Sequence, residues 1–177
     1  MEQDTQTPAL PVAEEFRNRV ILKAAKITKV EKHPGGTMLY ILTLDAGEPE
    51  PRQIVSSIVP FYTEEELLGK TIVLVYNLKP ANFRGVRSNG MLLAASDPSV
   101  TDHETCEVLF VPQFAPGTVL EPEDLTPPKE QLCYVKPEKF FSMPLYAKDG
   151  FVEVGGKKIG ADGIWLTAHV YVNGAVG

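Results

Sequence analysis

The sequence predicts a mainly β protein, in which a five-stranded barrel with one short helix is followed by a second β-rich part. Short runs of β-branched and aromatic residues recur along the first half of the chain, separated by turn-forming residues. One acidic segment with the chemistry of a helix start interrupts these runs. The second half is rich in proline, yet it contains further strand-like runs.

Five segments of the first half are expected to be strands. Residues 18–31 alternate imperfectly between apolar and basic positions, which predicts a long, bent first strand. The turn after it is expected at residues 33–36, His-Pro-Gly-Gly, because proline fixes φ and glycine permits left-handed backbone. The remaining four strands are expected at residues 38–44, 52–59, 71–76 and 91–95.

A short helix is expected between the third strand and the fourth. Thr63 is a suitable N-cap, the glutamates at 64–66 suit a first helical turn, and Gly69 ends the helix. Three strands, a short helix and two strands is the order of elements in an OB-fold, a barrel that binds oligonucleotides with its loops and one face. We therefore predict an OB-fold over residues 14–97, after a disordered leader at residues 1–13.

Residues 98–177 are expected to form a β-rich extension. Its clearest strands are predicted at 107–111 and 164–172, with Trp165, Tyr171 and Val172 buried in the core or in an interface. A hairpin turn at Gly155-Gly156 and a short helix at residues 137–141 are also predicted, the helix because proline is tolerated in a first turn.

Composition excludes several classes of protein. A hydrophobic content of 44% and a charged content of 23% are typical of globular domains. No apolar run approaches the roughly 20 residues that span a bilayer, and residues 1–13 lack the features of a secretory signal. Cys106 and Cys133 are far apart and form no CxxC pair. We therefore expect a cytoplasmic protein with no membrane segment, no metal and no cofactor.

The loop at residues 77–91 is the most informative segment. It contains three cations and no acid, although the chain has a net charge of −6. Such a loop suits a polyanion, and it offers neither a general base nor an oriented nucleophile. The chain also has no glycine-rich phosphate-binding motif, no HExxH and no nucleophile elbow, so we expect a non-catalytic protein.

The excess of acidic residues that gives the chain its negative net charge lies outside residues 14–97. Residues 14–97 carry a charge of +1, whereas residues 98–177 carry −5 and residues 1–13 carry −2. This balance falls short of the basic surface of a strong non-specific nucleic-acid binder. We therefore expect modest affinity for a polyanion, which weakens sharply with salt.

Together with this loop, several upstream motifs resemble the tRNA-binding domain family. That family includes a small bacterial tRNA-binding protein, the C-terminal domain of many methionyl-tRNA synthetases and endothelial monocyte-activating polypeptide II. The motifs lie within residues 16–96 and are Lys32-His33-Pro34, Leu39-Tyr40, Asp45-Ala46-Gly47, Arg52 and Ile54-Val55-Ser56. The chain departs from the family at residues 20–25, which read Val-Ile-Leu-Lys-Ala-Ala, and at Ser57, where glycine is usual.

The resemblance implies a module that binds the outside of tRNA by shape and phosphate charge. Its implied contact residues are Lys32, Arg52, Asn77, Lys79, Arg84, Arg87 and Ser88. For Asn77 and Ser88 an equal alternative is that their side chains stabilise turns. Phe83 could stack on a base or anchor the loop, and His33 is interpreted as a turn residue rather than a catalyst.

The second half resembles the C-terminal extension of the monocyte-activating polypeptide through Pro116-Gly117, Tyr146-Ala147, Gly150 and Asn173-Gly174. This implies an extension that packs on the barrel, imitates the second subunit of the dimeric bacterial protein and leaves the chain monomeric. The implied partners are tRNA and a synthetase, with methionyl-tRNA synthetase favoured. The alternative is a protein-interaction module of the same fold with weakened tRNA affinity, which the net charge, Ala25 and Ser57 favour.

Overall fold

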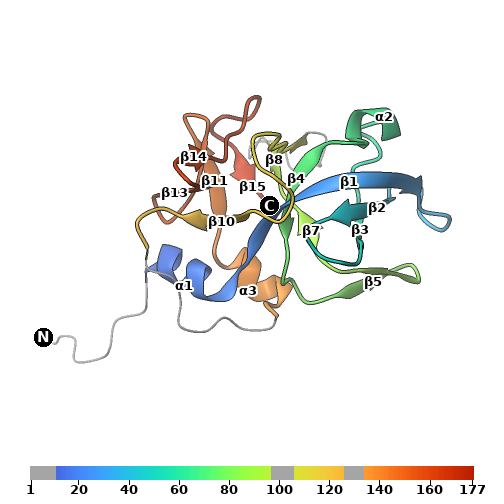
Figure 1. Ribbon diagram of the computed structural model, residues 1–177, viewed down its shortest axis with the longest axis horizontal. Coiled ribbons are helices and arrows are strands. Elements are labelled where there is room, and N and C mark those ends of the chain that lie inside the picture. The colour runs from blue at the N-terminus through green and yellow to red at the C-terminus, as the bar shows by residue number, and fades with distance from the viewer. Residues whose placement is uncertain (1–10, 97–105, 126–133) are drawn as a thin grey trace, which may run out of the picture.

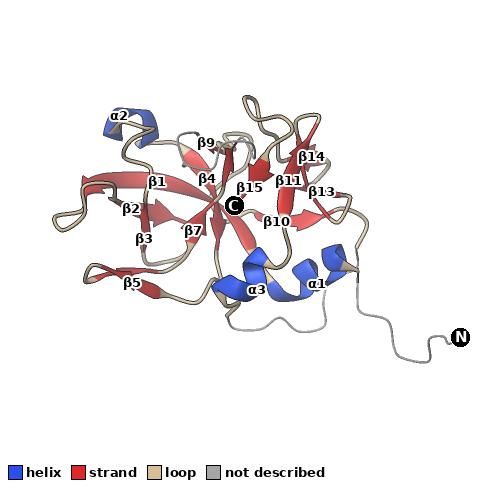
Figure 2. Cartoon of the chain, turned by 180° about the vertical axis from the view of Figure 1, so that it is seen from behind, coloured by secondary structure: helices blue, strands red, loops and turns tan. Residues whose placement is uncertain are grey.

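The computed structural model describes residues 11–96, 106–125 and 134–177 of the chain (Figure 1). The expected mainly β fold is confirmed, because the described residues form one large antiparallel sheet of 13 strands and a separate two-stranded hairpin. In the described ranges three short helices lie outside the sheets, and Figure 2 shows them. None of the helices in the described ranges is long and apolar enough to cross a membrane.

The first half contains the strands expected from the sequence, several of them shorter than expected. They are β1 (Leu22–Lys32), β2 (Tyr40–Asp45), β3 (Arg52–Ser56), β4 (Thr71–Val75), β7 (Met91–Leu92) and β8 (Ala94–Ser96). Strand β1 pairs with β2 on one side and β4 on the other, β2 also pairs with β3, and β4 also pairs with β7. The last expected strand is thus divided at Leu93 into β7 and β8.

The short helix α2 (Glu64–Leu67) is confirmed, together with its start signal. The Thr63 side chain accepts the Glu66 N–H, and the Glu66 carboxylate accepts the Thr63 N–H, which together form a capping box. Gly69 follows with a positive φ of 83°. Leu67 is fully buried, so the helix anchors the chain over the core of the first half.

Helix α1 (Val12–Arg19) corrects the sequence prediction at the start of the chain. Residues 18–21 were expected in the first strand, and Val12 and Ala13 in a leader, whose first ten residues lie outside the described ranges. Ala13, Phe16 and Val20 are buried at a spacing of three to four residues, so the segment is an amphipathic helix that packs on the second half.

The second half contributes β9 (Glu107–Val108), β10 (Val119–Pro122), β11 (Leu145–Lys148), β12 (Phe151–Val154), β13 (Lys157–Ala161), β14 (Ile164–Trp165), β15 (Ala175–Val176) and helix α3 (Pro137–Phe141). The predicted α3 helix and the hairpin turn at Gly155-Gly156 are confirmed. Strand β10 pairs with β1, and β15 pairs with β8, so the two halves share one sheet.

The prediction of a strand over residues 164–172 is wrong beyond Trp165. The backbone N–H groups of residues 169–171 donate to the Glu107 carboxylate instead of to a neighbouring strand. Of the side chains expected in the core or in an interface, Tyr171 is partly buried and packs against the core, Trp165 is partly buried, and Val172 is exposed. Despite its β-branched composition, the end of this run is therefore a loop that the Glu107 side chain fastens, and not a sheet strand.

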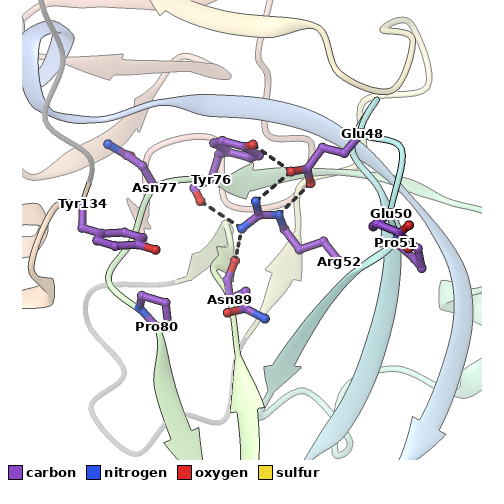
Figure 3. Close-up of a pocket in the computed structure, with 9 residues that line it drawn as sticks. All are labelled: Glu48, Glu50, Pro51, Arg52, Tyr76, Asn77, Pro80, Asn89 and Tyr134. Carbon is purple, nitrogen blue, oxygen red and sulfur yellow. Dashed lines mark hydrogen bonds and ion pairs between the residues drawn. The ribbon is translucent and has the colours of Figure 1, made fainter.

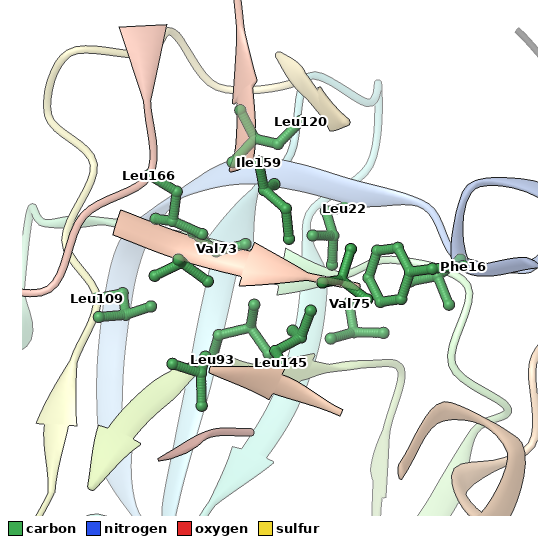
Figure 4. Close-up of a cluster of buried hydrophobic side chains, with 14 of the residues drawn as sticks. Phe16, Leu22, Val73, Val75, Leu93, Leu109, Leu120, Leu145, Ile159 and Leu166 are labelled. Atoms are coloured by element: carbon green, nitrogen blue, oxygen red, sulfur yellow. The ribbon is translucent and has the colours of Figure 1, made fainter. Parts of the chain in front are cut away.

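Strand β4 is buried on both faces, and this explains how the two halves pack. Ile72 and Leu74 belong to a core formed mainly by the first half, whereas Val73 and Val75 belong to a core shared more evenly with the second half. Figure 4 shows Val73 and Val75 among Leu93, Leu145, Ile159 and Leu166. The second half therefore covers an apolar face of the first. The expected boundary at residues 97–98 lies outside the described ranges.

Candidate nucleic-acid interface

The loop at residues 77–91 contains a β-hairpin that the sequence did not predict. Strands β5 (Ala81–Phe83) and β6 (Val86–Ser88) pair with each other and stand apart from the large sheet. The two residues between them, Arg84 and Gly85, have φ values of 50° and 88°, as a type I′ hairpin turn requires. Asparagine or glycine usually occupies the first of these positions, because a left-handed backbone costs other residues conformational energy. An arginine at this position therefore indicates a functional role.

The hairpin tip lies beside the turn that joins β1 to β2. A Cβ atom built on Gly36 would be 3.4 Å from Arg84 Cδ, and one built on Gly35 would be 3.8 Å from Arg84 Cβ. The stem of the exposed Arg84 side chain therefore lies over this turn.

His33 joins the turn to the hairpin. Its side chain is buried, Nδ1 accepts the Gly35 N–H at 2.8 Å, and Nε2 lies 2.8 Å from the Phe83 carbonyl oxygen. Because Nδ1 is an acceptor, the proton is on Nε2, which donates to Phe83. The sequence interpretation of His33 as a turn residue agrees with this geometry, which also gives it a positioning role.

Replacement of His33 by alanine is expected to loosen the hairpin, because it removes the hydrogen bond to Phe83. A net loss of about 1 kcal/mol corresponds to roughly fivefold more frequent opening. Hydrogen exchange followed by NMR should therefore show about fivefold faster exchange at the amides of Phe83 and Val86, which pair with each other beside the hairpin turn. Lys32→Ala, at the exposed neighbouring position, should leave these rates unchanged, and equal rates in both variants would disprove the positioning role.

The foot of the hairpin is fastened to β3. The buried Ser88 hydroxyl accepts the Val55 N–H at 2.9 Å and donates to the Gly90 carbonyl at 2.9 Å. The Gln53 side chain donates to the Arg87 carbonyl at 2.8 Å. Ser88 is thus used inside the protein, and the geometry favours its structural alternative over a contact with RNA.

Asn77 is also buried and makes internal hydrogen bonds. Its Oδ1 accepts the Ile21 N–H, and its Nδ2 donates to the Arg19 carbonyl, each at 2.9 Å. These bonds tie the start of the loop to the junction of α1 and β1. The expected contact of Asn77 with sugar or base edges is therefore not supported by its position.

Arg52 is the centre of a polar cluster, shown in Figure 3. Its Nε and Nη2 donate to the Glu48 carboxylate at 2.9 and 3.0 Å, and Nη1 donates to the Asn89 carbonyl at 2.8 Å and the Tyr76 carbonyl at 3.3 Å. The guanidinium lies 4.1 Å from the Tyr76 ring centre, and the Tyr76 hydroxyl donates to Glu48 at 2.8 Å. The expected reach of Arg52 into a tRNA groove is thus opposed by these internal bonds.

The charges in this cluster reinforce one another. The hydrogen bonds from Arg52 hold the pKa of Glu48 below its usual range, and the same pair raises the pKa of Arg52. The carboxylate also raises the pKa of the Tyr76 hydroxyl. Sequence reasoning missed Glu48. Its one sequence signal is that it lies four residues before Arg52, and this spacing predicts an ion pair only within a helix.

Four of the candidate cations are exposed, and they lie on the hairpin or beside it. We call these residues the hairpin surface: Lys32, Lys79, Arg84 and Arg87. Arg87 Nε donates to Asn89 Oδ1 at 3.1 Å, which directs this side chain along the hairpin. Phe83 is 41% exposed, so it is available for stacking. Within the described ranges no group of His, Cys, Asp and Glu side chains is placed to hold a metal ion.

Comparison with known proteins gives consistent relatives. A family model described as "Putative tRNA binding domain" matches residues 22–118. Methionine--tRNA ligase of Treponema denticola is 41% identical over 160 residues, which are 85% of this chain and 20% of that protein. The chain therefore spans about a fifth of that relative's length.

Two solved structures share the fold and part of the sequence. The C-terminal domain of Plasmodium vivax p43 superposes with a TM-score of 0.78 at 26% identity, covering 90% of this chain and 98% of that one. A MetRS related protein from Pyrococcus horikoshii gives a TM-score of 0.53 at 33% identity, covering 64% and 98%. The likeness to p43 thus extends over both halves of the chain.

Proposed function

Because this chain belongs to the tRNA-binding domain family, we propose that it is a non-catalytic module that binds tRNA through the hairpin surface. The observation that carries this proposal is the hairpin itself. Three of the four cations lie in an acid-free loop, and the hydrogen bond from His33 holds that loop against the turn that bears the fourth. Such an array is suited to the phosphates of a folded RNA.

The remaining candidate residues act indirectly in this proposal. Arg52, Asn77 and Ser88 position the loop through internal hydrogen bonds and leave phosphate binding to the exposed cations. Because Glu48 neutralises Arg52, this arginine adds no phosphate contact and affinity is modest, while the contacts of the exposed cations remain sensitive to salt. The same neutral pair is the observation that favours the second candidate function, a protein-interaction module with weakened tRNA affinity.

The biological partner in this proposal is a synthetase, with a methionyl-tRNA synthetase favoured by the relatives. In cis or in trans, the module would raise the effective concentration of tRNA near a catalytic body without adding a catalytic contact. The barrel would occupy residues 14–97 and the extension residues 98–177, acting as a built-in substitute for a second subunit. The core that the two halves share supports the proposal of a monomer, and we propose a cytoplasmic location.

The experiment that tests this function is a fluorescence-anisotropy titration of bulk tRNA at several salt concentrations. Lys79→Ala/Arg84→Ala is expected to weaken binding and to reduce the log–log salt slope by about one to two units, since two phosphate contacts are lost. Lys148→Ala/Lys157→Ala removes the same charge from the second half and should change the slope little.

Two results would contradict the proposal. If the native protein shows no saturable binding at low salt, tRNA binding fails and the interaction module becomes the working function. If both double variants lose the same slope, the hairpin surface is not the phosphate-binding site.

A further inference from the structure

A pocket of about 590 Å³ lies at the foot of the hairpin, next to the hairpin surface. Its walls include Glu50, Arg52, Tyr76, Pro80, Asn89 and Tyr134. Figure 3 shows Tyr134 on the side of the pocket opposite Glu50 and Pro51, with the Arg52 cluster between them. None of the contacts proposed above for tRNA phosphates uses this space.

The charge of the pocket makes it a poor phosphate site. Its one cation, Arg52, already gives three donor groups to Glu48 and to two backbone carbonyls. The second carboxylate of the wall, Glu50, would repel an anion. The pocket is therefore suited to an uncharged polar group rather than to phosphate.

Tyr134 offers the stacking surface. The Tyr76 ring already has Arg52 at 4.1 Å and Lys23 Nζ at 3.8 Å from its centre. By contrast, Tyr134 is 56% exposed. Its position is fixed by its neighbour Val135, which is buried, donates to the Asn77 carbonyl at 2.8 Å and accepts the Lys79 N–H at 2.9 Å. The tyrosine is thus held beside the start of the hairpin.

Asn89 and Glu50 offer complementary polar groups. Because Asn89 Oδ1 accepts the Arg87 Nε–H at 3.1 Å, the side-chain amide is oriented with Nδ2 as a free donor within the described ranges. Glu50 is an exposed acceptor. A planar, uncharged group with a hydrogen-bond acceptor would match the Tyr134 ring and the Asn89 amide.

We propose that this pocket binds one unstacked nucleobase of an RNA whose phosphates lie on the hairpin surface. The base stacks on Tyr134, and a ring acceptor receives the Asn89 amide. The inference rests on the proposed function, because the neighbouring phosphates deliver the base to the pocket. Aromatic side chains serve proteins that bind single-stranded RNA in the same way.

The test compares two polyanions, bulk tRNA and heparin, which carries negative charge without bases. Tyr134→Ala is expected to weaken tRNA binding about fivefold or more, with the salt slope unchanged, because a stacking contact is lost and no phosphate contact. Heparin binding should stay within twofold. Tyr134→Phe keeps the ring and should bind tRNA as the native protein does. Tyr146→Ala, at an exposed tyrosine of β11, is the matched control.

The outcomes separate this inference from the proposed function. If the native protein binds tRNA but Tyr134→Ala binds it equally well, the base pocket is disproved while tRNA binding stands. If Tyr134→Ala weakens heparin as much as tRNA, the residue supports the fold of the surface and the pocket is again disproved. If the native protein binds no tRNA, both proposals fail.

Discussion

Replacement of Glu107 by alanine is expected to lower the free energy of unfolding by about 3 kcal/mol, since it removes one acceptor from three backbone groups at once. The buried Glu107 carboxylate accepts the N–H groups of His169, Val170 and Tyr171 at 2.8, 2.9 and 3.1 Å. These bonds hold the segment that follows β14 onto the sheet. Urea denaturation should show the loss as a lower midpoint.

The matched control is Glu153→Ala, which removes a carboxylate from β12, where the side chain is partly exposed. It should cost well under 1 kcal/mol. In a thermal scan, Glu107→Ala should melt about 6 to 12 °C below the native protein. A midpoint within the error of the Glu153 variant would show that water replaces the carboxylate without cost.

Replacement of Glu48 by alanine is expected to change stability and tRNA affinity in opposite directions. The Arg52 side chain is 19% exposed, so removal of its carboxylate leaves a largely buried charge and should cost about 2 kcal/mol. The released guanidinium then becomes available to phosphate. Titration with tRNA should show tighter binding and a salt slope steeper by about one unit.

A double-mutant cycle checks this account. Arg52→Met should also be destabilised, because Glu48 loses its partner, and the Glu48→Ala/Arg52→Met protein should lose less than the two single variants together. Additive losses would show that the two side chains do not act as a pair. Tighter tRNA binding by both single variants would show that release of Arg52 is not the cause.

The same pair gives the stability a defined dependence on acid. Arg52 holds the pKa of Glu48 below its ordinary value of 4.5, so the pair stabilises the fold above that pH. The contribution is lost as the pH falls through the lower, folded-state pKa. The Glu48→Ala protein should therefore lose less stability than the native protein when both are moved from pH 6 to strongly acidic solution.

The strands of the first half could be predicted because their local signals agree with their tertiary roles. The capping residues at Thr63 and Glu66, and the turn at Gly155-Gly156, fix their elements through short-range contacts. Helix α1 was missed, although Ala13, Phe16 and Val20 carry a helical period, because the proline- and acid-containing start of the chain was interpreted as a leader. Residues 166–172 were misassigned because their backbone N–H groups do not follow one neighbouring strand. Leu166 and Ala168 donate to the Ile159 and Gly150 carbonyls, and residues 169–171 donate to the distant Glu107 carboxylate.

The exposed cations of the site could also be predicted, since acid-free loops are visible in a sequence. The internal use of Arg52, Asn77 and Ser88 could not, because most of their partners lie between 24 and 58 residues away and depend on how the loop folds back. Tyr134 carries no local signal at all. It enters the pocket only because Val135 bonds to Asn77 and Lys79.

The two buried faces of β4 have a consequence for synthesis on the ribosome. Residues 11–96 emerge first, yet Val73, Val75 and Leu93 form one wall of a core whose other wall includes Leu145, Ile159 and Leu166. At translation rates of about 5–20 residues per second, the roughly 70 residues in between take about 4 to 14 s to follow. During this interval the nascent first half presents an uncovered apolar wall, so we expect it to require chaperone protection until the last strands arrive.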